Sequence, residues 1–404
     1  MLIKNALVYR EDFRFQRGFI QIKDGRIVKI GDEQEESMLQ TAEAEEVIDA
    51  GGCHVIPGLI DMHFHGCMGA DFCDGTEEAI RTLAEYELKA GVTAICPATL
   101  TLPTAELKHI LTAGAEYRRK QKRKKESGEV LCEADLVGIN MEGPFISRVK
   151  KGAQNGAYII PADTETAEEL LRAGEGLVKA IGLAPEENPG FEEYIAAVKD
   201  KVRVSLAHTN ADYDTAMAAI RAGAGHAVHL FNAMPPFGHR EPGTVGAVFD
   251  SPNVTAELIC DGNHVHPAVV RSVFRILGDD RVVLISDSLR ACGLGDGPIM
   301  LGGQEVIVSG TKAVLKDGGN LAGSVTDLAE CLRIAVKEMG ISLESAVRAA
   351  TANPAQVLGI SEEYGTLQVG KCGDAVLLDE DLRVKTVIKN GMMICYGTKE
   401  LPNS

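Results

Sequence analysis

The stretch Val55-Ile-Pro-Gly-Leu-Ile-Asp-Met-His-Phe-His-Gly66 joins an apolar, strand-like segment to two histidines. Side chains alternate along a strand, so His63 and His65 are expected to point to the same face at the end of this segment. Two neutral imidazole nitrogens placed in this way can bind one metal ion. A polar strand end without a ligand has the same local pattern, so the rest of the chain decides between these two interpretations.

A strand-then-helix rhythm continues from this stretch through the middle of the chain. Its apolar strands are expected at Val55–Met62, Val92–Pro97, Leu136–Met141, Leu177–Gly182, Val202–Ala207, Ala227–Leu230, Val254–Ile259 and Val282–Ile285. Helical spacing of apolar residues between them predicts helices such as Glu77–Lys89, Leu107–Arg119, Thr166–Arg172, Asp214–Arg221 and Ala268–Leu277. This alternation predicts an α/β fold, a closed (β/α)8 TIM-type barrel. A Gly-rich hairpin insertion is expected at Ile299–Leu315, before a last helix at Val325–Met339.

The two ends of the chain have a different pattern, with short strands separated by turn residues. The expected strands are Met1–Tyr9, Phe19–Lys23, Arg26–Ile30, Glu46–Asp49, Asp374–Leu378, Val384–Lys389 and Met392–Tyr396. Neither end has enough strands for a sheet protein of its own, so together they are expected to form one small β-sandwich domain. The predicted organisation is residues 1–54 and 366–404 for the small domain and residues 55–365 for the barrel.

Composition excludes several classes of partner. The net charge of −17 disfavours nucleic acid and anionic membranes. The basic block Arg118–Lys125 is therefore interpreted as the solvated end of a helix. No apolar run reaches the ~18 residues of a membrane span, and the first residues lack a signal-peptide core, so a cytoplasmic location is expected. The ten cysteines include no Cys-x-x-Cys pair, which argues against a disulfide framework.

Residue types suited to metal binding and acid–base chemistry follow the predicted barrel strands. In such a barrel the reacting groups lie at the carboxyl ends of the strands. The residues at those ends are His63, His65, Glu142, His208, His229, His264 and Asp287. Any one of them alone could be a core histidine or a turn residue, but together they predict a metal site. Glu142, His208 and His229 leave room for water, which is typical of a catalytic site, and Asp287 could accept a proton from that water and return it to a leaving group.

These motifs resemble the amidohydrolase superfamily and, within it, the deacetylases that act on an amino-sugar phosphate. The resemblance covers nearly the whole chain. Besides Pro57–Gly66 and Asp287 it includes Met141–Phe145, Ala207–Ala211, His229–Met234, Gly238–Gly243, Asp261–His264, Leu321–Ser324, Ala352–Ala355 and Gly365–Lys371. It implies removal of acetate from N-acetyl-D-glucosamine 6-phosphate, giving D-glucosamine 6-phosphate, in amino-sugar catabolism or recycling.

The resemblance also implies roles for individual residues. Glu142, His208 and His229 would hold the main metal, Asp287 would be the general base and acid, and His264 would stabilise the charge on the amide carbonyl. The residues implied for substrate binding are Asn232, Ala233 and Arg240 for the phosphate, and Ala153, Leu321, Ala322 and Gly323 for the sugar.

Metal number and assembly follow from the same resemblance. Because His63 and His65 are both present, a second ion bridged by Glu142 is feasible. One or two divalent ions per subunit are therefore expected, zinc or iron by ligand type. The resemblance further implies a homodimer whose active sites are shared between subunits.

Three alternatives stay open. The galactosamine 6-phosphate counterpart differs by the orientation of one hydroxyl, which few contacts read. Another amidohydrolase, such as a dihydroorotase-like or deaminase-like enzyme, is disfavoured because many cyclic amidohydrolases use a bridging lysine where this chain offers Glu142. A non-catalytic barrel that serves as a binding scaffold is disfavoured because the full ligand set and Asp287 are present.

Overall fold

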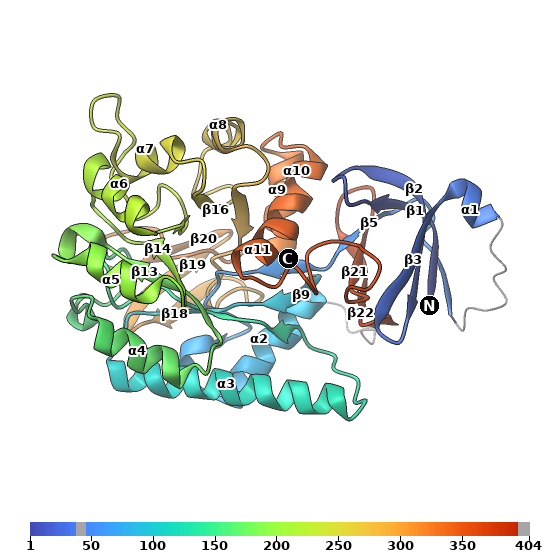
Figure 1. Ribbon diagram of the computed structural model, residues 1–404, viewed down its shortest axis with the longest axis horizontal. Coiled ribbons are helices and arrows are strands. Elements are labelled where there is room, and N and C mark those ends of the chain that lie inside the picture. Colours follow the sequence, from blue (N-terminus) through green and yellow to red (C-terminus); the bar gives the residue numbers. More distant parts are fainter. Residues whose placement is uncertain (38–45, 395–404) are drawn as a thin grey trace.

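The structure is a computed structural model that describes residues 1–37 and 46–394. A region of strands surrounded by helices lies beside a region built mostly of strands, to which both ends of the chain contribute (Figure 1). Cys395 and Tyr396, the end of the predicted strand Met392–Tyr396, lie outside the described residues.

The first region is a curled, parallel sheet of the TIM-barrel type, as predicted. Its strands follow one another in chain order, and every pairing between them is parallel. They are β6 (Leu59–Asp61), β9 (Val92–Ile95), β10 (Ala98–Thr99), β11 (Asp135–Leu136), β12 (Ile139–Met141), β13 (Val178–Leu183), β14 (Arg203–Leu206), β15 (His226–Ala227), β16 (Thr255–Ile259) and β17 (Val282–Ile285). Beyond the last strand, Asp287 N donates to His63 O at 2.9 Å and His65 N donates to Ser288 O at 2.7 Å, which joins the end of the sheet to its beginning.

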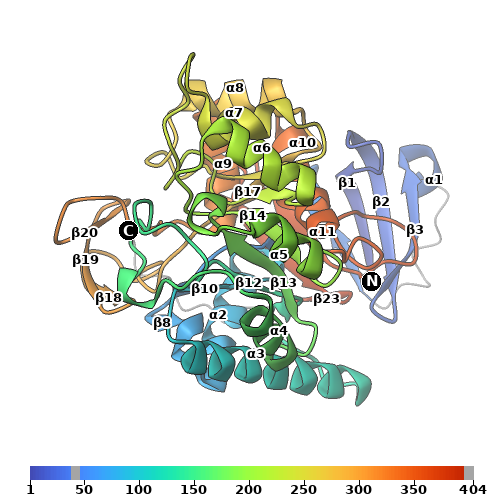
Figure 2. The same ribbon diagram turned by 60° about the vertical axis from the view of Figure 1, so that its left-hand side comes forward.

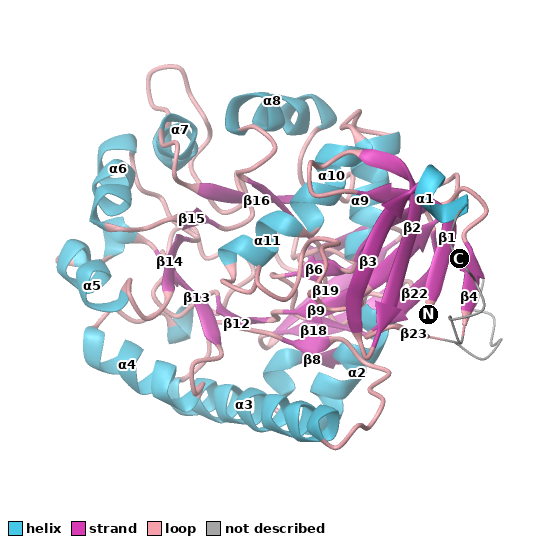
Figure 3. Cartoon of the chain, turned by 45° about the vertical axis from the view of Figure 1, so that its right-hand side comes forward, coloured by secondary structure: helices cyan, strands magenta, loops and turns pink. Residues whose placement is uncertain are grey.

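Helices form the outer layer around these strands (Figure 3). They are α2 (Glu77–Lys89), α3 (Thr104–Glu126), α4 (Thr164–Ala173), α5 (Phe191–Val198), α6 (Tyr213–Ala222), α7 (Gly243–Asp250), α8 (Pro267–Leu277), α9 (Leu328–Lys337), α10 (Leu343–Ala350) and α11 (Ala352–Val357). Several begin at a side chain that accepts a free backbone N–H of the first turn, as Thr76 does for α2 and Asp212 does for α6. Their apolar faces and the strands share one large core. None of the helices in the described ranges is both long and apolar enough to cross a membrane.

The second region is a sheet that contains strands from both ends of the chain. Its order is β23-β22-β21-β5-β1-β2-β3, with β4 paired to β1. The strands are β1 (Leu2–Tyr9), β2 (Phe15–Lys23), β3 (Arg26–Asp32), β4 (Val47–Asp49), β5 (His54–Pro57), β21 (Ala375–Leu378), β22 (Val384–Lys389) and β23 (Met392–Met393), with the short helix α1 (Glu33–Ser37) after β3. The antiparallel pairing of β5 with β21 joins the two ends, as expected. That this sheet forms a sandwich stays a prediction.

The predicted single strand Val55–Met62 is wrong, because it is two strands in different sheets. β5 pairs with β1 and β21, whereas β6 pairs with β9 of the barrel. Gly58 lies at the break, where a Cβ atom would stand 2.0 Å from Thr93 Oγ1. The chain therefore passes from one sheet to the other at a point too crowded for any side chain.

The predicted hairpin insertion is confirmed as a three-stranded antiparallel sheet. Its strands are β18 (Gly297–Leu301), β19 (Gln304–Ser309) and β20 (Lys312–Leu315). Figure 2 shows these strands set apart from the barrel helices. Their apolar residues pack against Leu100 and Leu289, which follow barrel strands β10 and β17, so the insertion covers one side of the barrel end where the candidate site lies.

Candidate active site

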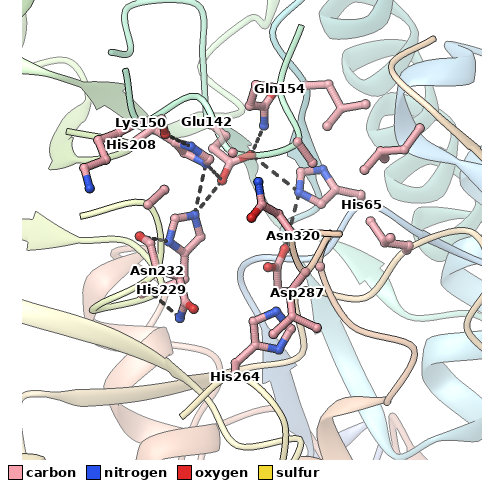
Figure 4. A pocket seen from close by; sticks show the side chains of 18 of the residues that line it. His65, Glu142, Lys150, Gln154, His208, His229, Asn232, His264, Asp287 and Asn320 are labelled. Atoms are coloured by element: carbon pink, nitrogen blue, oxygen red, sulfur yellow. Dashed lines mark hydrogen bonds and ion pairs between the residues drawn. The ribbon is translucent and has the colours of Figure 1, made fainter. Parts of the chain in front are cut away.

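The residues predicted at the strand ends meet at one end of the barrel. A cavity of about 390 Å³ opens there, and Figure 4 shows the side chains that point into it. Six of the seven predicted metal or acid–base residues line it, namely His65, Glu142, His208, His229, His264 and Asp287. The seventh, His63, is fully buried, and its ring lies 5.6 Å from that of His65 between ring centroids.

Backbone conformation turns three of these residues away from their strands. His208, His229 and Asp287 have φ of 42°, 24° and 49°, in the left-handed region that residues other than glycine rarely adopt. Each directly follows or lies near the end of its strand, so the unusual φ redirects the side chain into the cavity. Backbone strain of this kind costs of order 1–3 kcal/mol per residue and is concentrated at functional sites.

Glu142 is the centre of the group. Its Oε1 lies 2.8 Å from His208 Nε2, 2.8 Å from His229 Nε2 and 3.5 Å from His63 Nε2. Its Oε2 lies 3.5 Å from His65 Nε2. Burial raises the pKa of Glu142, but His208 and His229 outweigh it and hold that pKa well below the ordinary value. Glu142 is therefore a buried carboxylate surrounded by four imidazoles.

The hydrogen bonds on the far side of two imidazoles show what this group fits. His208 Nδ1 donates to Lys150 O at 2.9 Å, and His229 Nδ1 donates to Asn232 O at 3.2 Å. The other nitrogen, Nε2, then donates to Glu142 only if the ring is protonated, and in a neutral ring it carries a lone pair. Both lone pairs face Glu142 and lie 3.2 Å from each other. Lone pairs and a carboxylate that converge in this way repel one another unless a cation lies between them, so the donor set fits a divalent metal ion.

A second group of ligand atoms adjoins the first. His63, His65 and Asp287 offer atoms that all lie within 4.8 Å of one another, and so do His63, Glu142 and His229. Asp287 Oδ1 lies 3.4 Å from His65 Nε2 and 3.9 Å from His63 Nε2. Burial raises the pKa of Asp287, but the nearby histidines outweigh it and keep the pKa below the ordinary value. The two groups together could hold one or two ions.

His264 lies on the opposite side of Asp287 from the imidazole cluster (Figure 4). Its Nδ1 donates to Asp261 Oδ2 at 2.8 Å, and Asp261 Oδ1 accepts the backbone N–H groups of Asn263 and His264, each at 2.9 Å. Burial lowers the pKa of His264, but Asp261 outweighs it, with Asp287 adding to the effect, and the pKa is raised. A protonated His264 can donate from Nε2 into the cavity.

The predicted substrate-binding residues divide into two sets. Ala153, Asn232, Ala233, Leu321 and Gly323 line the cavity. Ala322 is buried with the hairpin insertion and does not line it. Arg240 is exposed on the loop between β15 and α7 and does not reach the cavity of its own chain. Its predicted contact with the phosphate stays a prediction.

Several residues of the site were missed by the sequence analysis. Gln154 Nε2 donates to Glu142 Oε2, and its Oε1 accepts Thr101 N at 2.7 Å. Asn320 and Lys150 also line the cavity. Gln154 and Asn320 are sequence neighbours of Ala153 and Leu321, which was the only signal that could have indicated them.

Comparisons with known proteins show the family of the chain and several near-full-length relatives. The model of the amidohydrolase family matches residues 54–394. The chain is 35% identical to N-acetylglucosamine-6-phosphate deacetylase of Bacillus subtilis (strain 168), over 99% of this chain and 98% of that protein. It is 32% identical to N-acetylgalactosamine-6-phosphate deacetylase of Escherichia coli O157:H7, over 84% of this chain and 87% of that protein. A mutant N-acetyl-D-glucosamine-6-phosphate deacetylase of Mycobacterium smegmatis, solved with N-acetyl-D-glucosamine-6-phosphate, is similar with a TM-score of 0.86 and 30% identity, covering 98% of this chain and 99% of that one.

Proposed function

The chain belongs to the amidohydrolase family, and from this premise we propose that it hydrolyses the acetamide group of N-acetyl-D-glucosamine 6-phosphate to acetate and D-glucosamine 6-phosphate. The observation that carries the proposal is the convergence of Glu142, His208, His229 and Asp287 on one cavity. Near-full-length relatives of the chain are named N-acetylglucosamine-6-phosphate deacetylase.

Glu142, His208 and His229 would hold the divalent ion on which this family depends. When bound, such an ion would supply Lewis-acid chemistry, lowering the pKa of water and polarising the amide carbonyl. The Asp287 carboxylate takes one proton from the attacking water. It gives that proton to the amide nitrogen as the C–N bond breaks, so the water oxygen ends in acetate and the sugar leaves as the amine. His264 donates from Nε2 to the carbonyl oxygen while negative charge develops there.

The remaining cavity residues orient the sugar phosphate. Asn232 and Ala233 supply polar contacts for the phosphate, and Ala153, Leu321 and Gly323 contact the sugar ring. Arg240 completes the phosphate site from the second subunit of a homodimer, where its forked guanidinium suits a dianion. Zinc or iron fits the imidazole and carboxylate ligands, and one or two ions are bound per subunit.

Acetate release tests the proposed reaction directly. We expect the purified protein to release acetate from N-acetyl-D-glucosamine 6-phosphate, to lose this activity on treatment with a chelator, and to regain it with Zn²⁺ or Fe²⁺. N-acetyl-D-galactosamine 6-phosphate is assayed in parallel, because a relative at 32% identity is named N-acetylgalactosamine-6-phosphate deacetylase. Faster turnover of this epimer would make it the preferred substrate in place of the gluco compound. Absence of acetate from both substrates with metal bound would refute the proposal.

The shared site is tested by mixing two inactive variants. Arg240→Ala chains keep Asp287, and Asp287→Asn chains keep Arg240. Random exchange of subunits should make half of the dimers mixed. In each mixed dimer one of the two sites combines an intact Asp287 with an intact Arg240, so about a quarter of the parent activity should return. If the mixture stays inactive after subunit exchange is verified, each chain is self-sufficient.

A further inference from the structure

His63 rests on a buried carboxylate that the mechanism above does not use. Glu257, on β16, is fully buried, and its Oε2 accepts a hydrogen bond from His63 Nδ1 at 2.8 Å. In the sequence Glu257 lies inside the apolar run Val254–Ile259, and neither the cavity lining nor the predicted site includes it.

Glu257 accepts two further hydrogen bonds. The backbone N–H of His229 donates to Oε2 at 2.9 Å, and His226 Nε2 donates to Oε1 at 3.0 Å. His226 is in turn held by Thr255, whose Oγ1 lies 2.7 Å from His226 Nδ1. The Glu257 carboxylate thus holds two parts of the site. It holds the side chain of His63, which follows β6, and the backbone of His229 after β15, where φ is 24°. Three donors satisfy the buried charge.

An ionised carboxylate only accepts hydrogen bonds, so Glu257 determines which nitrogen of His63 carries the proton. With Nδ1–H donated to Glu257, the neutral His63 ring presents a lone pair at Nε2. That atom is buried and has no hydrogen-bond partner in the described part of the chain. It faces Glu142 Oε1 at 3.5 Å and Asp287 Oδ1 at 3.9 Å.

His226 shows what a purely structural histidine looks like in the same network. It is also fully buried, but both of its ring nitrogens have partners, Thr255 and Glu257. His63 has one nitrogen bonded and the other aimed at two carboxylates. This difference distinguishes a ligand from a core residue.

Building on the proposed function, we propose that Glu257 is a positioning residue that holds His63 ready to bind a second ion together with His65 and Asp287. This ion lies beside the one held by Glu142, His208 and His229. Second partners of metal-binding histidines fix the tautomer and the ring orientation, and their loss weakens metal affinity about 10–100-fold.

The test is a metal titration in the absence of substrate. Metal-depleted parent protein is titrated with Co²⁺, whose visible absorption reports coordination, and bound metal is counted by elemental analysis. We expect two ions per chain in the parent. In Glu257→Gln we expect the second ion to bind about 10–100-fold more weakly and the first ion, whose ligand His229 donates only its backbone N–H to Glu257, to be weakened less. Glu133→Gln is the matched control, because Glu133 is a buried carboxylate that accepts two side-chain hydrogen bonds outside the site.

Two further variants separate positioning from general destabilisation. In His63→Gln the second ion should already be weakened, and adding Glu257→Gln should weaken it no further, because both changes act through one ligand. Thr255→Val perturbs the network more gently, so it should weaken the second ion in the same direction and keeps the test available if Glu257→Gln does not fold. Equal weakening of both ions in Glu257→Gln, or an unchanged second ion, would overturn the inference.

The outcomes also separate this inference from the proposed function. A parent protein that binds only one ion would overturn the role of Glu257 whatever its activity. A parent that binds two ions but releases no acetate would refute the deacetylase proposal and leave the positioning role intact.

Discussion

Replacing Lys389 with methionine should destabilise the junction between the terminal sheet and the barrel. The Lys389 ammonium is fully buried and donates to Asp135 Oδ2 at 2.7 Å, to Asp374 Oδ2 at 2.6 Å and to Thr93 O at 3.0 Å. Lys389 belongs to β22 of the terminal sheet, whereas Thr93 and Asp135 belong to barrel strands β9 and β11. Methionine fills a similar volume but leaves two buried carboxylates without this cation.

The loss of stability depends on which hydrogen-bond and ion-pair partners Asp135 and Asp374 keep without Lys389. Asp135 retains Tyr364 Oη at 2.8 Å and an ion pair with Lys125. Asp374 retains the backbone N–H of Asn390 at 2.7 Å. Removing one partner of a buried ion pair costs about 3–5 kcal/mol. With an unfolding entropy of about 2.1 cal/mol/K per residue, a chain of 404 residues loses about 4–6 °C of melting temperature.

Thermal unfolding followed by circular dichroism measures this shift. Lys385→Met is the control, because Lys385 is exposed on the same strand, and its midpoint should move by less than about 1 °C. Adding Asp374→Asn to Lys389→Met should recover part of the loss, since it removes an unpaired buried charge. A Lys389→Met midpoint within about 1 °C of the parent would refute the reasoning.

The stability that Lys389→Met loses relative to the parent should depend on pH in a predictable direction. Burial raises the pKa of Asp135, but Lys389 and Lys125 outweigh it and depress the pKa in the folded state. A depressed folded pKa contributes stability that is present above the unfolded value of about 3.9 and is lost as the pH falls towards the folded value. Without Lys389 this contribution is smaller. The stability difference between parent and Lys389→Met should therefore narrow as the pH falls below about 4, and a gap that widens would contradict this assignment.

Other predictions concern the site and the crossing between the sheets. Asp287→Asn should lower kcat for acetate release about 10²–10⁴-fold, and a loss below tenfold would exclude it as the proton carrier. Asp261→Asn should lower kcat with little change in KM, because we propose that His264, to which Asp261 is hydrogen-bonded, stabilises charge that develops only during the reaction; a change in KM alone would indicate a role in binding instead. Gly58→Ala should destabilise the fold by about 1–3 kcal/mol, since its Cβ would lie 2.0 Å from an oxygen on β9. Gly225→Ala, whose nearest atom is a guanidinium nitrogen at 3.2 Å, should cost less in the same thermal assay, and equal costs would contradict the steric argument.

Sequence reasoning worked where a feature repeats. The period of the apolar residues predicted the alternation of strands and helices, and helix α2 has the predicted bounds, Glu77–Lys89. The rule that active residues follow parallel strands then predicted that Glu142, His208 and Asp287 lie together at one end of the barrel, and all three line the same cavity there, while their roles stay predictions. Both inferences depend on patterns that are local in sequence and are imposed by backbone geometry.

It failed where a contact between distant segments decides the outcome. Val55–Met62 is mostly apolar, and the Pro57-Gly58 pair inside it, which can mark a turn, was taken as part of one strand. The close approach of Thr93 to Gly58, a contact between segments far apart in the sequence, accompanies the change of sheet at this point. Glu257 looks like a single charged residue in a mostly apolar strand, and its proposed role depends on His63, which is 194 residues away. A partner at that separation has no local signal.

Two of the buried charge clusters among the described residues, one at the junction between the terminal sheet and the barrel and one at the barrel end, balance their charge differently. At the junction, Lys389 neutralises Asp135 and Asp374 with a cation that is covalently part of the chain. At the barrel end, Glu142 and Glu257 are buried, and within the described residues their ion-pair partners are histidines, with no lysine or arginine. An imidazole can exchange a proton for a metal ion, whereas a lysine would occupy the place of that ion permanently. At the junction, the Lys389 ammonium therefore neutralises the carboxylates permanently. At the barrel end, the negative charge of the carboxylates stays available to a metal ion that can bind and dissociate.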